Sequence, residues 1–393
     1  MRYAPFVQRV AGEGAEAWNI HMAAEARVAK GEDIHVLTIG DSDFPTPTSV
    51  AEAAKAAIDA GRTKYMAMQG EPALRRIIAA RHERLTGVPT RPEQVVVTPG
   101  AQTALLGAGL CLYGTGDEVI APEPMYATYP ATLRAGGASL VTVPSPPETG
   151  FHANPDAIAA AVTERTRAIV LTTPNNPTGA VFSREELEAI TEICLRHDLW
   201  VISDEVYETL CYGRPHVCPA SLPGMAERTV VLGSLSKSHA MAGWRLGWTI
   251  APGDLPLHIC RFAMCNTFGV PGFVQDAAIE ALTSLPDAIP EMRAAYQDRA
   301  ARLVARLDQV PGLTCRHPEG GMFAMIDIRA LGISAYAFAE SLLSERNVAV
   351  LPADGFGPSA AGHIRVNLGT PDAVFDEALT RIAAHATRAA AAE

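Results

Sequence analysis

One segment, GSLSKSHAMAGWRLGW (residues 233–248), combines hydroxyl, ammonium and guanidinium groups at short spacing. Ser234, Ser236 and Lys237 follow directly after a stretch that is typical of a buried strand, and Arg245 comes eight residues after the lysine. An isolated lysine is usually solvated in a surface loop. Two chemical interpretations compete with that one. Ser234 and Lys237 could be the nucleophile and base of an acyl-transfer enzyme, or Lys237 could be a Schiff-base lysine whose neighbours hold a phosphate.

Motifs elsewhere in the chain favour the Schiff-base interpretation. Acyl-transfer enzymes of the penicillin-binding type also need Ser-Asp-Asn and Lys-Thr-Gly motifs, but this chain has Ser203-Asp204-Glu205 and no Lys-Thr-Gly. A Schiff-base cofactor with a pyridine ring and a phosphate needs a carboxylate beside its ring nitrogen, donors for its ring oxygen and an anion site at a helix N-terminus. The sequence offers candidates for all three, and a Ser-Lys hydrolase is a remote alternative.

Other common catalytic motifs are missing from the sequence. Gly107-Ala108-Gly109 and Gly114-Thr115-Gly116 lack the third glycine of a dinucleotide-binding fingerprint, and no Gly-x4-Gly-Lys loop is present. The 11 histidines show no His-Glu-x-x-His or paired Cys/His spacing, so we expect no metal site. The seven cysteines form no Cys-x-x-Cys pair and are expected to be reduced thiols.

Sequence blocks along nearly the whole chain resemble the signature blocks of class I/II aminotransferases, which are fold-type I enzymes that depend on pyridoxal 5'-phosphate. The blocks are LTIGDSDFPTP (37–47), KYMAMQGEPALR (64–75), TTPNNPTG (172–179), SDEVYE (203–208), SLSKSHAMAGWRLG (234–247) and HIRVNLG (363–369). They stand in the order of the family. The resemblance implies an α/β fold and an enzyme that moves an amino group between an amino acid and a 2-oxo acid in ping-pong half-reactions.

The resemblance assigns the central catalytic roles to four residues. Lys237 would bind the cofactor covalently and then move the proton at the substrate α-carbon. Asp204 would lie against the pyridine nitrogen and keep it protonated, because a positively charged ring is the better electron sink. Tyr207 and Asn176 would donate to the ring oxygen.

Further residues would hold the cofactor in this resemblance. The phosphate would be bound by the backbone N–H groups or side chains of Gly100, Ala101, Gln102, Ser234, Ser236 and Arg245. Tyr126 would stack on the pyridine face. Tyr65 would reach the phosphate of the neighbouring subunit, so that a homodimer with shared active sites is expected.

The substrate carboxylate needs a cation, and Arg365 in HIRVNLG is the candidate because guanidinium binds carboxylate in a bidentate way. Gly40 and Asn176 would approach the same carboxylate. Trp18 and Ile20 could belong to an N-terminal arm that closes over the site, or could be plain core or interface residues.

The sequence motifs constrain the type of reaction and the substrate less tightly than they constrain the cofactor. Carbon–sulfur β-lyases share the fold and the same lysine, aspartate and arginine, and are the alternative to an aminotransferase. The runs at 197–210, 220–229 and 356–365 are similar to bacterial aminotransferases that take arginine as amino donor and pyruvate as acceptor. Arginine and pyruvate are therefore the expected substrates.

The surrounding sequence predicts elements that position these residues. Short apolar runs at 95–99, 117–122, 168–174, 199–204, 229–234 and 245–250 alternate with helical stretches, which predicts an α/β domain with a mostly parallel sheet. One helical stretch, 183–197, opens with Ser183 as its N-cap and Glu186 three residues on. Strand-like runs at 320–328, 347–352 and 363–369 indicate a smaller α+β domain.

We expect three parts along the chain. Residues 1–44 form an N-terminal arm and part of the small domain, 45–285 the large cofactor-binding domain and 286–393 the small C-terminal domain. The third part begins with a helix whose apolar positions, from Met292 to Val310, recur at helical spacing.

Composition narrows the class of partner. The 32 basic and 43 acidic residues give a net charge of −11, which argues against nucleic-acid binding and against anionic membranes. No run of about 18 apolar residues and no basic-then-apolar leader is present, so a cytoplasmic location without membrane contact is expected. The expected partners are small-molecule amino and 2-oxo acids.

Overall fold

The computed structural model describes residues 2–11 and 17–391, and its larger part is built on a central sheet. Within these residues the sheet has seven strands in the order β2-β8-β7-β6-β5-β3-β4, and only β8 runs antiparallel to its neighbours. The strands are β2 (Val95–Thr98), β3 (Glu118–Glu123), β4 (Ser139–Pro144), β5 (Thr166–Thr172), β6 (Trp200–Asp204), β7 (Thr229–Ser234) and β8 (Gly247–Ile250). The predicted α/β fold with a mostly parallel sheet is confirmed.

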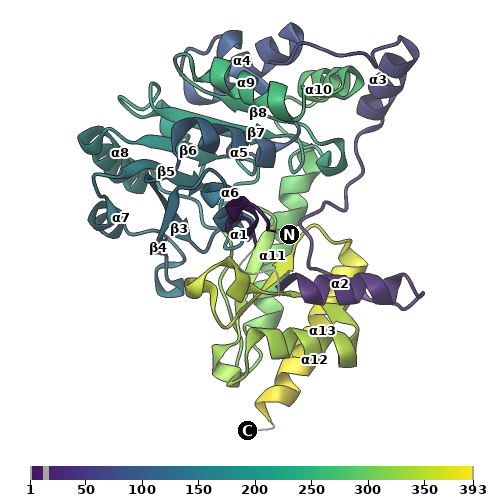
Figure 1. Cartoon of the computed structure of the whole chain (residues 1–393). Helices are drawn as coiled ribbons and strands as arrows, with labels where there is room; N and C mark the ends of the chain where they lie inside the picture. The colour runs from purple at the N-terminus through teal and green to yellow at the C-terminus, as the bar shows by residue number, and fades with distance from the viewer. Residues whose placement is uncertain (1, 12–16, 392–393) are drawn as a thin grey trace.

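Helices cover both faces of this sheet (Figure 1). The helices of the larger part are α3 (Thr48–Asp59), α4 (Pro72–Thr86), α5 (Ala101–Leu112), α6 (Tyr129–Arg134), α7 (Pro155–Ala161), α8 (Arg184–His197), α9 (Leu255–Asn266) and α10 (Gly272–Ser284). Successive side chains of a strand point to opposite faces. Accordingly, Ile202 of β6 packs in a core with α5 and α9, whereas Val201 packs in a second core with α7 and α8.

A separate core lies in the lower part of the view in Figure 1. A sheet of four short strands there has the order β12-β13-β10-β9, and a further parallel pair joins β1 to β11. The elements are β1 (His35–Val36), β9 (Thr314–Cys315), β10 (Phe323–Asp327), β11 (Val348–Ala349), β12 (Leu351–Pro352), β13 (His363–Asn367), α2 (Ala17–Val28), α11 (Pro290–Leu307), α12 (Ala335–Arg346) and α13 (Asp372–Ala390). Helix α1 (Pro5–Arg9) has no buried residue and lies beside α6 of the larger part, where Arg9 donates to the Ala135 carbonyl. The number of strands given for each sheet refers to the described residues.

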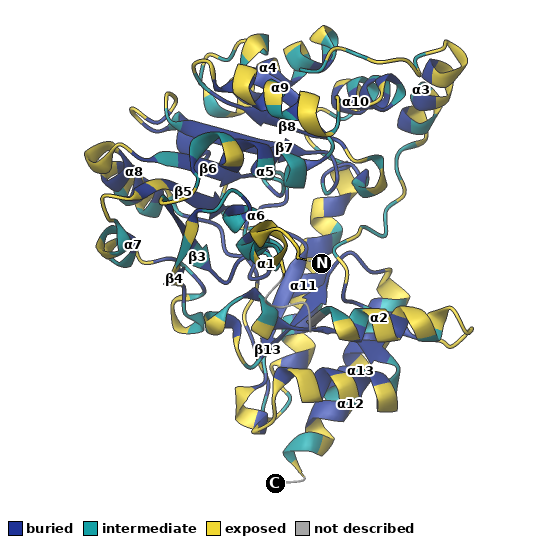
Figure 2. Ribbon diagram, viewed as in Figure 1, coloured by how far each residue is buried: buried dark blue, intermediate teal, exposed yellow. Residues whose placement is uncertain are grey.

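Residues from both ends of the chain form this second core. Ile20 and Leu37 pack with residues of α11, α12 and α13, and all of these side chains are buried. Figure 2 shows the buried faces of α11 and α13 turned toward each other and exposed residues on the outside. The packing joins residues between 20 and 37 to residues between 289 and 386 in one core, and the predicted domain boundaries themselves stay predictions.

The predicted strands and helices largely match the structure. Each of the six predicted runs of the large sheet overlaps a strand, and Ser183 and Glu186 form the predicted capping box at the start of α8. Strand β4 was not predicted, because it lies at the sheet edge and only Val143 of its six residues is buried. The helix expected to reach Val310 ends at Leu307, so that Val310 lies beyond it.

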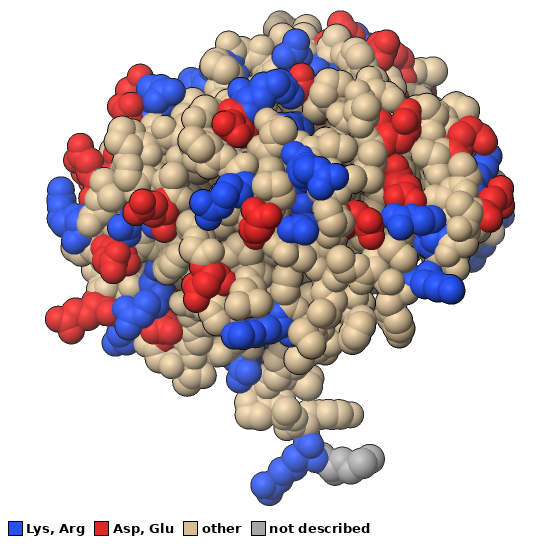
Figure 3. Space-filling model, turned by 90° about the horizontal axis from the view of Figure 1, so that it is seen from above, with Lys and Arg blue, Asp and Glu red and all other residues tan. Residues whose placement is uncertain are grey.

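The surface charges, the cysteines and the lengths of the apolar helices complete the description of the fold. On the face seen in Figure 3, basic and acidic side chains are interspersed and no large area of one sign is visible. All seven cysteines are free thiols. None of the helices in the described ranges has both the length and the apolar character needed to cross a bilayer.

Candidate active site

Four strands deliver polar residues to one edge of the large sheet. Strands β5, β6 and β7 are parallel and end at Thr172, Asp204 and Ser234, respectively. Strand β2 has the same direction, because it and β7 both pair antiparallel with β8, and it leads into Gly100 and α5. In open α/β sheets, ligands bind outside the carboxyl ends of the strands.

A cavity of about 430 Å³ opens at this edge, between the large sheet and residues of the small core. Most of the predicted site residues line it. They are Gly40, Ala101, Gln102, Tyr126, Asn176, Asp204, Tyr207, Ser234, Ser236, Lys237, Arg245 and Arg365. Twelve side chains or backbone groups from segments far apart in the sequence are thus brought together as predicted.

The Lys237 ammonium lies inside this cavity. It donates a hydrogen bond from Nζ to the carbonyl oxygen of Gly40. Burial lowers the pKa of Lys237 to about 8, with Arg365 and Arg245 acting in the same direction and Asp41 opposing them. A lysine with this pKa is partly neutral near physiological pH, so it can act as a nucleophile and as a base.

Asp204 is buried at the floor of the cavity. The Tyr129 hydroxyl donates to its Oδ2, and the backbone N–H of Val206 donates to its Oδ1 at 3.2 Å. Burial raises the pKa of Asp204 to about 6, and both hydrogen bonds oppose that rise. A carboxylate held in this way is suited to pair with a cationic group such as a protonated ring nitrogen.

Asn176 connects two predicted functions. Its Oδ1 accepts a hydrogen bond from Nη1 of Arg365 at 2.9 Å, and its side chain is hydrogen-bonded to Tyr207. Burial raises the pKa of Tyr207, which therefore stays protonated and able to donate. The Tyr126 ring lies 6.0 Å from that of Tyr129 in an edge arrangement and lines the same cavity.

An anion-binding corner is formed where α5 begins. Ser234 Oγ lies 2.9 Å from Ser236 Oγ, and both serines are buried beside Arg245 in the cavity wall. The first turn of a helix presents N–H groups without partners in the helix, and α5 begins at Ala101. Three kinds of anion donor therefore converge here: hydroxyl, guanidinium and helix N-terminus.

Gly100 and Gln102 shape this corner. Gly100 has a φ of 83°, a backbone conformation that favours glycine, and a Cβ atom there would displace the Arg245 guanidinium. The Gln102 side chain is hydrogen-bonded to Thr128 and Thr132, and its backbone N–H belongs to the first turn of α5. Gly100 does not line the cavity itself, and its role is to leave space for the Arg245 guanidinium.

Arg365 is almost completely buried, at 1% exposure, on the opposite side of the cavity. Its guanidinium lies over Phe323 and Phe356, 4.0 and 4.9 Å from the ring centroids, and Nη2 donates to the Thr38 carbonyl. Burial lowers its pKa to about 10, so the group still carries its charge at neutral pH. Its Nε has no hydrogen-bond partner among the described residues.

Two predicted positions, Tyr65 and Ile20, lie away from the cavity. Tyr65 is 85% exposed and contacts Phe268, with the two tilted rings 5.0 Å apart between centroids, outside the cavity of its own chain. Ile20 is buried in the small core, which corrects the alternative that placed it over the site. Trp18 does line the cavity, and it packs edge-on against His21.

The sequence did not predict several residues that line the cavity, and Tyr129 and Asp41 are two of them. Tyr129 lies three residues after the predicted Tyr126, and its contact with Asp204 joins positions 75 residues apart. Asp41 directly follows the predicted Gly40 and also lines the cavity. Asp41 stands inside the block 37–47 and Tyr129 stands close to the predicted Tyr126, so the signal was their position near a predicted residue.

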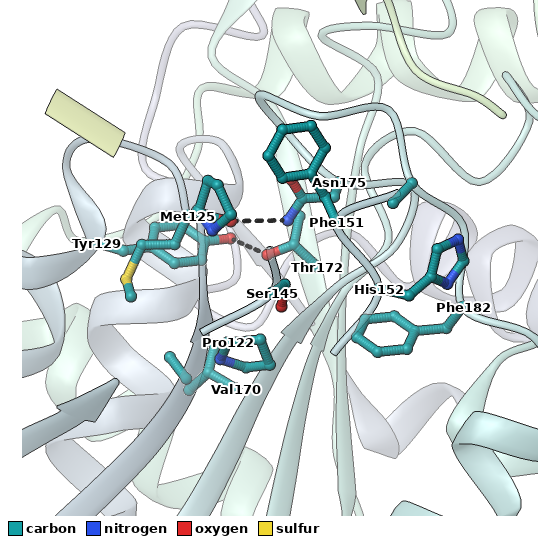
Figure 4. Close-up of a pocket in the computed structure, with 13 residues that line it drawn as sticks. Pro122, Met125, Tyr129, Ser145, Phe151, His152, Val170, Thr172, Asn175 and Phe182 are labelled. Carbon is teal, nitrogen blue, oxygen red and sulfur yellow. Dashed lines mark hydrogen bonds between the residues drawn. The ribbon is translucent and has the colours of Figure 1, made fainter. Parts of the chain in front are cut away.

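A second, smaller cavity lies behind Tyr129 and Thr172 (Figure 4). Its volume is about 20 Å³, enough for one water molecule. The Thr172 hydroxyl donates to the Tyr129 oxygen at 3.2 Å, and Ser145 faces the same space. The two residues separate this space from the larger cavity and carry the hydrogen-bond chain to Asp204.

A fold of this kind, with a lysine, an aspartate and an arginine in one cleft, matches a known class. The family model described as aminotransferase class I and II covers residues 32–382, and the chain belongs to this family. Enzymes of this family depend on pyridoxal phosphate, and the chain is an aminotransferase with the fold-type I architecture.

The relatives agree with this assignment. The arginine–pyruvate transaminase of Pseudomonas aeruginosa is 50% identical over 383 residues, which cover 98% of each chain. The aspartate/prephenate aminotransferase of Cereibacter sphaeroides is 37% identical, over 92% of this chain and 93% of its own. The solved aspartate aminotransferase of Thermus thermophilus with maleate superposes with a TM-score of 0.92 at 34% identity, over 98% of this chain and all of the other.

Proposed function

We propose that the 430 Å³ cavity binds pyridoxal phosphate. The observation that carries the proposal is the placement of Lys237, Asp204 and an anion corner around one cavity. Ser234, Ser236, Arg245 and the start of α5 suit a phosphate that carries nearly two negative charges, and Gly100 leaves room for the guanidinium there. The donor set therefore fits this cofactor.

When bound, the cofactor supplies an aldehyde carbon and an electron-withdrawing ring. Lys237 Nζ would hold and move the proton of the substrate α-carbon, because burial lowers its pKa to about 8 and leaves it partly neutral near physiological pH. Asp204 stabilises the positive charge on the ring nitrogen, and Asn176 and Tyr207 donate to the ring oxygen. Tyr126 packs on the ring face.

Arg365 binds the α-carboxylate of the substrate in this proposal. Its planar group is held flat by two aromatic rings and by Thr38, so its orientation is fixed before substrate arrives. Asn176 and the Gly40 segment lie next to it and complete the carboxylate site. A fixed cation of this kind places the α-amino group of the substrate near Lys237.

The proposed substrates are L-arginine as amino donor and pyruvate as acceptor. Support comes from the Pseudomonas aeruginosa arginine–pyruvate transaminase, which is 50% identical over nearly the whole chain, against 37% for the aspartate/prephenate enzyme. We also propose a homodimer with shared sites. An exposed Tyr65–Phe268 pair on the surface suits an interface in which Tyr65 reaches the partner's phosphate. The cytoplasmic location stays a prediction.

The proposed function is tested by adding single amino acids to the purified holoenzyme without an acceptor. A true donor converts the cofactor from its aldehyde to its amine form, which the absorbance spectrum reports. We expect conversion by arginine at lower concentration than by alanine, aspartate or phenylalanine, and return of the spectrum on adding pyruvate. A tenfold preference for one of the other donors would overturn the arginine assignment and leave the aminotransferase assignment intact.

A further inference from the structure

More basic than acidic side chains line the catalytic cavity. The described lining contains the cations Lys237, Arg245 and Arg365 but only two carboxylates, Asp41 and Asp204. A substrate with a cationic side chain adds a further positive charge to this space. A guanidinium taken out of water without a partner loses several kcal/mol of hydration. Among the described residues that line the cavity, Asp41 and Asp204 are the carboxylates that could receive it.

Asp204 is not available for this role. It is buried, its two oxygens accept from Tyr129 and from the Val206 N–H, and it faces the proposed site of the ring nitrogen. Asp41 differs in each respect. It is exposed and lines the cavity, and among the described residues its carboxylate accepts a hydrogen bond from the neighbouring Ser42 N–H, to Oδ1 at 2.9 Å. An ionised carboxylate can accept several more.

Asp41 also stands where a long side chain would pass. Its neighbour Gly40 accepts the hydrogen bond from Lys237, so Asp41 follows directly after the reacting region. Asp41 and Ala242 line both the catalytic cavity and an adjoining cavity of about 420 Å³, and they mark the junction of the two. A substrate held by its carboxylate at Arg365 and its amine at Lys237 can extend only through its side chain, and this junction gives that side chain room.

The wall beside Asp41 suits an aliphatic stem. Ile39 lines the cavity and is 45% exposed, and Trp18 lines the same side. Methylene groups pack on such apolar surface while the charged end reaches a polar partner. The combination of an apolar wall and a carboxylate at its end is the pattern expected for arginine or lysine side chains.

We propose that Asp41 is the specificity-determining residue that binds the side-chain cation of the amino donor. Its carboxylate accepts hydrogen bonds from the guanidinium, and the two oxygens match two N–H groups of that plane. The inference rests on the proposed arginine function. It assigns to this chain the acidic partner that an arginine substrate requires and that the sequence alone did not name.

The test measures half-reactions of the holoenzyme with single donors and no acceptor. Asp41→Asn is compared with wild type, and Asp41→Glu serves as the variant that keeps the charge. The donors are arginine, lysine and norleucine, which is neutral and has an unbranched side chain. We expect Asp41→Asn to lower the specificity constant for arginine about 10- to 100-fold, as for a lost hydrogen bond to a charged group, and to leave norleucine within about threefold. Asp41→Glu should restore part of the arginine rate.

A binding measurement separates recognition from proton transfer. Calorimetric titration of the holoenzyme with 5-guanidinopentanoate, which has no α-amine, should show weaker binding to Asp41→Asn than to wild type, whereas hexanoate should bind both equally. Equal loss for arginine and norleucine would show that Asp41 acts on Lys237 and would overturn the inference. An unchanged arginine preference in Asp41→Asn would overturn it while the proposed function stands. A wild-type enzyme that prefers norleucine to arginine would overturn both the inference and the proposed arginine function. A larger loss of the specificity constant for lysine than for arginine in Asp41→Asn would show that the carboxylate binds an ammonium group in preference to a guanidinium, and would overturn the assignment to arginine.

Discussion

The Tyr129 hydroxyl donates a hydrogen bond to Oδ2 of Asp204 and accepts one from Thr172. Tyr129 is completely buried at the start of α6, so this bond is held in place by the fold and not by a flexible side chain. A donor on a carboxylate favours its ionised form. Tyr129 therefore opposes the effect of burial on Asp204 and keeps that group charged near neutral pH.

Tyr129→Phe should move the acid limb of the pH–rate profile upward. Removing the hydroxyl takes away a contact that lowers the pKa of Asp204, and burial then raises that pKa beyond about 6. We expect the rate at pH 6 to fall about tenfold relative to wild type, with a smaller loss at pH 8. The measurement is the single-turnover rate from pH 5 to 9. Tyr113→Phe, another buried tyrosine of the same core, is the control and should not shift the profile.

Lys237→Ala should abolish turnover and leave a folded protein that still holds the cofactor without a covalent bond. The anion corner and Asp204 do not depend on the lysine, so ring and phosphate contacts survive. Borohydride reduction of wild type followed by peptide mass analysis should find the cofactor on the peptide that contains Lys237. The label on Lys64, an exposed lysine next to Tyr65, would show the assignment to be wrong.

Mixed dimers test the sharing of active sites. Tyr65→Ala and Lys237→Ala chains should each be poorly active alone, whereas a mixture contains sites that have both Tyr65 and Lys237. Recovery of roughly a quarter of wild-type activity is expected from random pairing. Heterodimers proven by mass spectrometry that show no recovery would contradict a role of Tyr65 across the interface.

His152 should make the stability of the protein depend on alkaline pH. Its ring nitrogens contact Glu186 and Glu319 at 2.8 and 3.1 Å, and these hydrogen bonds raise its pKa to about 9. The unfolded chain has a histidine pKa near 6.5. The contribution, on the order of 3 kcal/mol, is therefore complete below about pH 6.5 and is lost as pH rises through about 9.

The measurement for His152 is urea unfolding at pH 6 and pH 10. His152→Gln should be less stable than wild type at pH 6 and close to it at pH 10. His258→Gln is the matched control, because His258 is about half exposed beside a highly exposed Asp254. A difference between wild type and His152→Gln that is equal at both pH values would mean that the histidine charge does not stabilise the fold.

The sequence was most informative where function demands a residue type within a block. Lys237, Asp204 and Arg365 stand in blocks whose order is that of the family, and the strand ends that carry Asp204 and Ser234 were predicted from apolar runs that the buried sheet requires. Nothing in those runs indicates which distant side chain meets Asp204. The contact from Tyr129 depends on where α6 begins relative to β6.

Other features that the sequence did not predict have the same physical origin. Strand β4 has one buried residue, so burial left little pattern in its sequence. Asp41 stands between Gly40 and Ser42 in a loop without periodicity, and its access to two cavities depends on the packing of Ala242. Local patterns reveal what burial or local hydrogen bonding imposes, whereas contacts across the fold need the three-dimensional arrangement.

The burial of Arg365 implies a conflict between the stability of the fold and the activity of the enzyme. The Arg365 guanidinium is 1% exposed, and its Nε has no hydrogen-bond partner in the part of the chain that the structure describes, so burial costs this group much of its hydration. An unbranched apolar side chain such as methionine at this position would fill the space between Phe323 and Phe356 and would relieve that desolvation. The same substitution would remove the guanidinium that the proposed carboxylate site needs, so the fold could gain stability from a change that abolishes substrate binding.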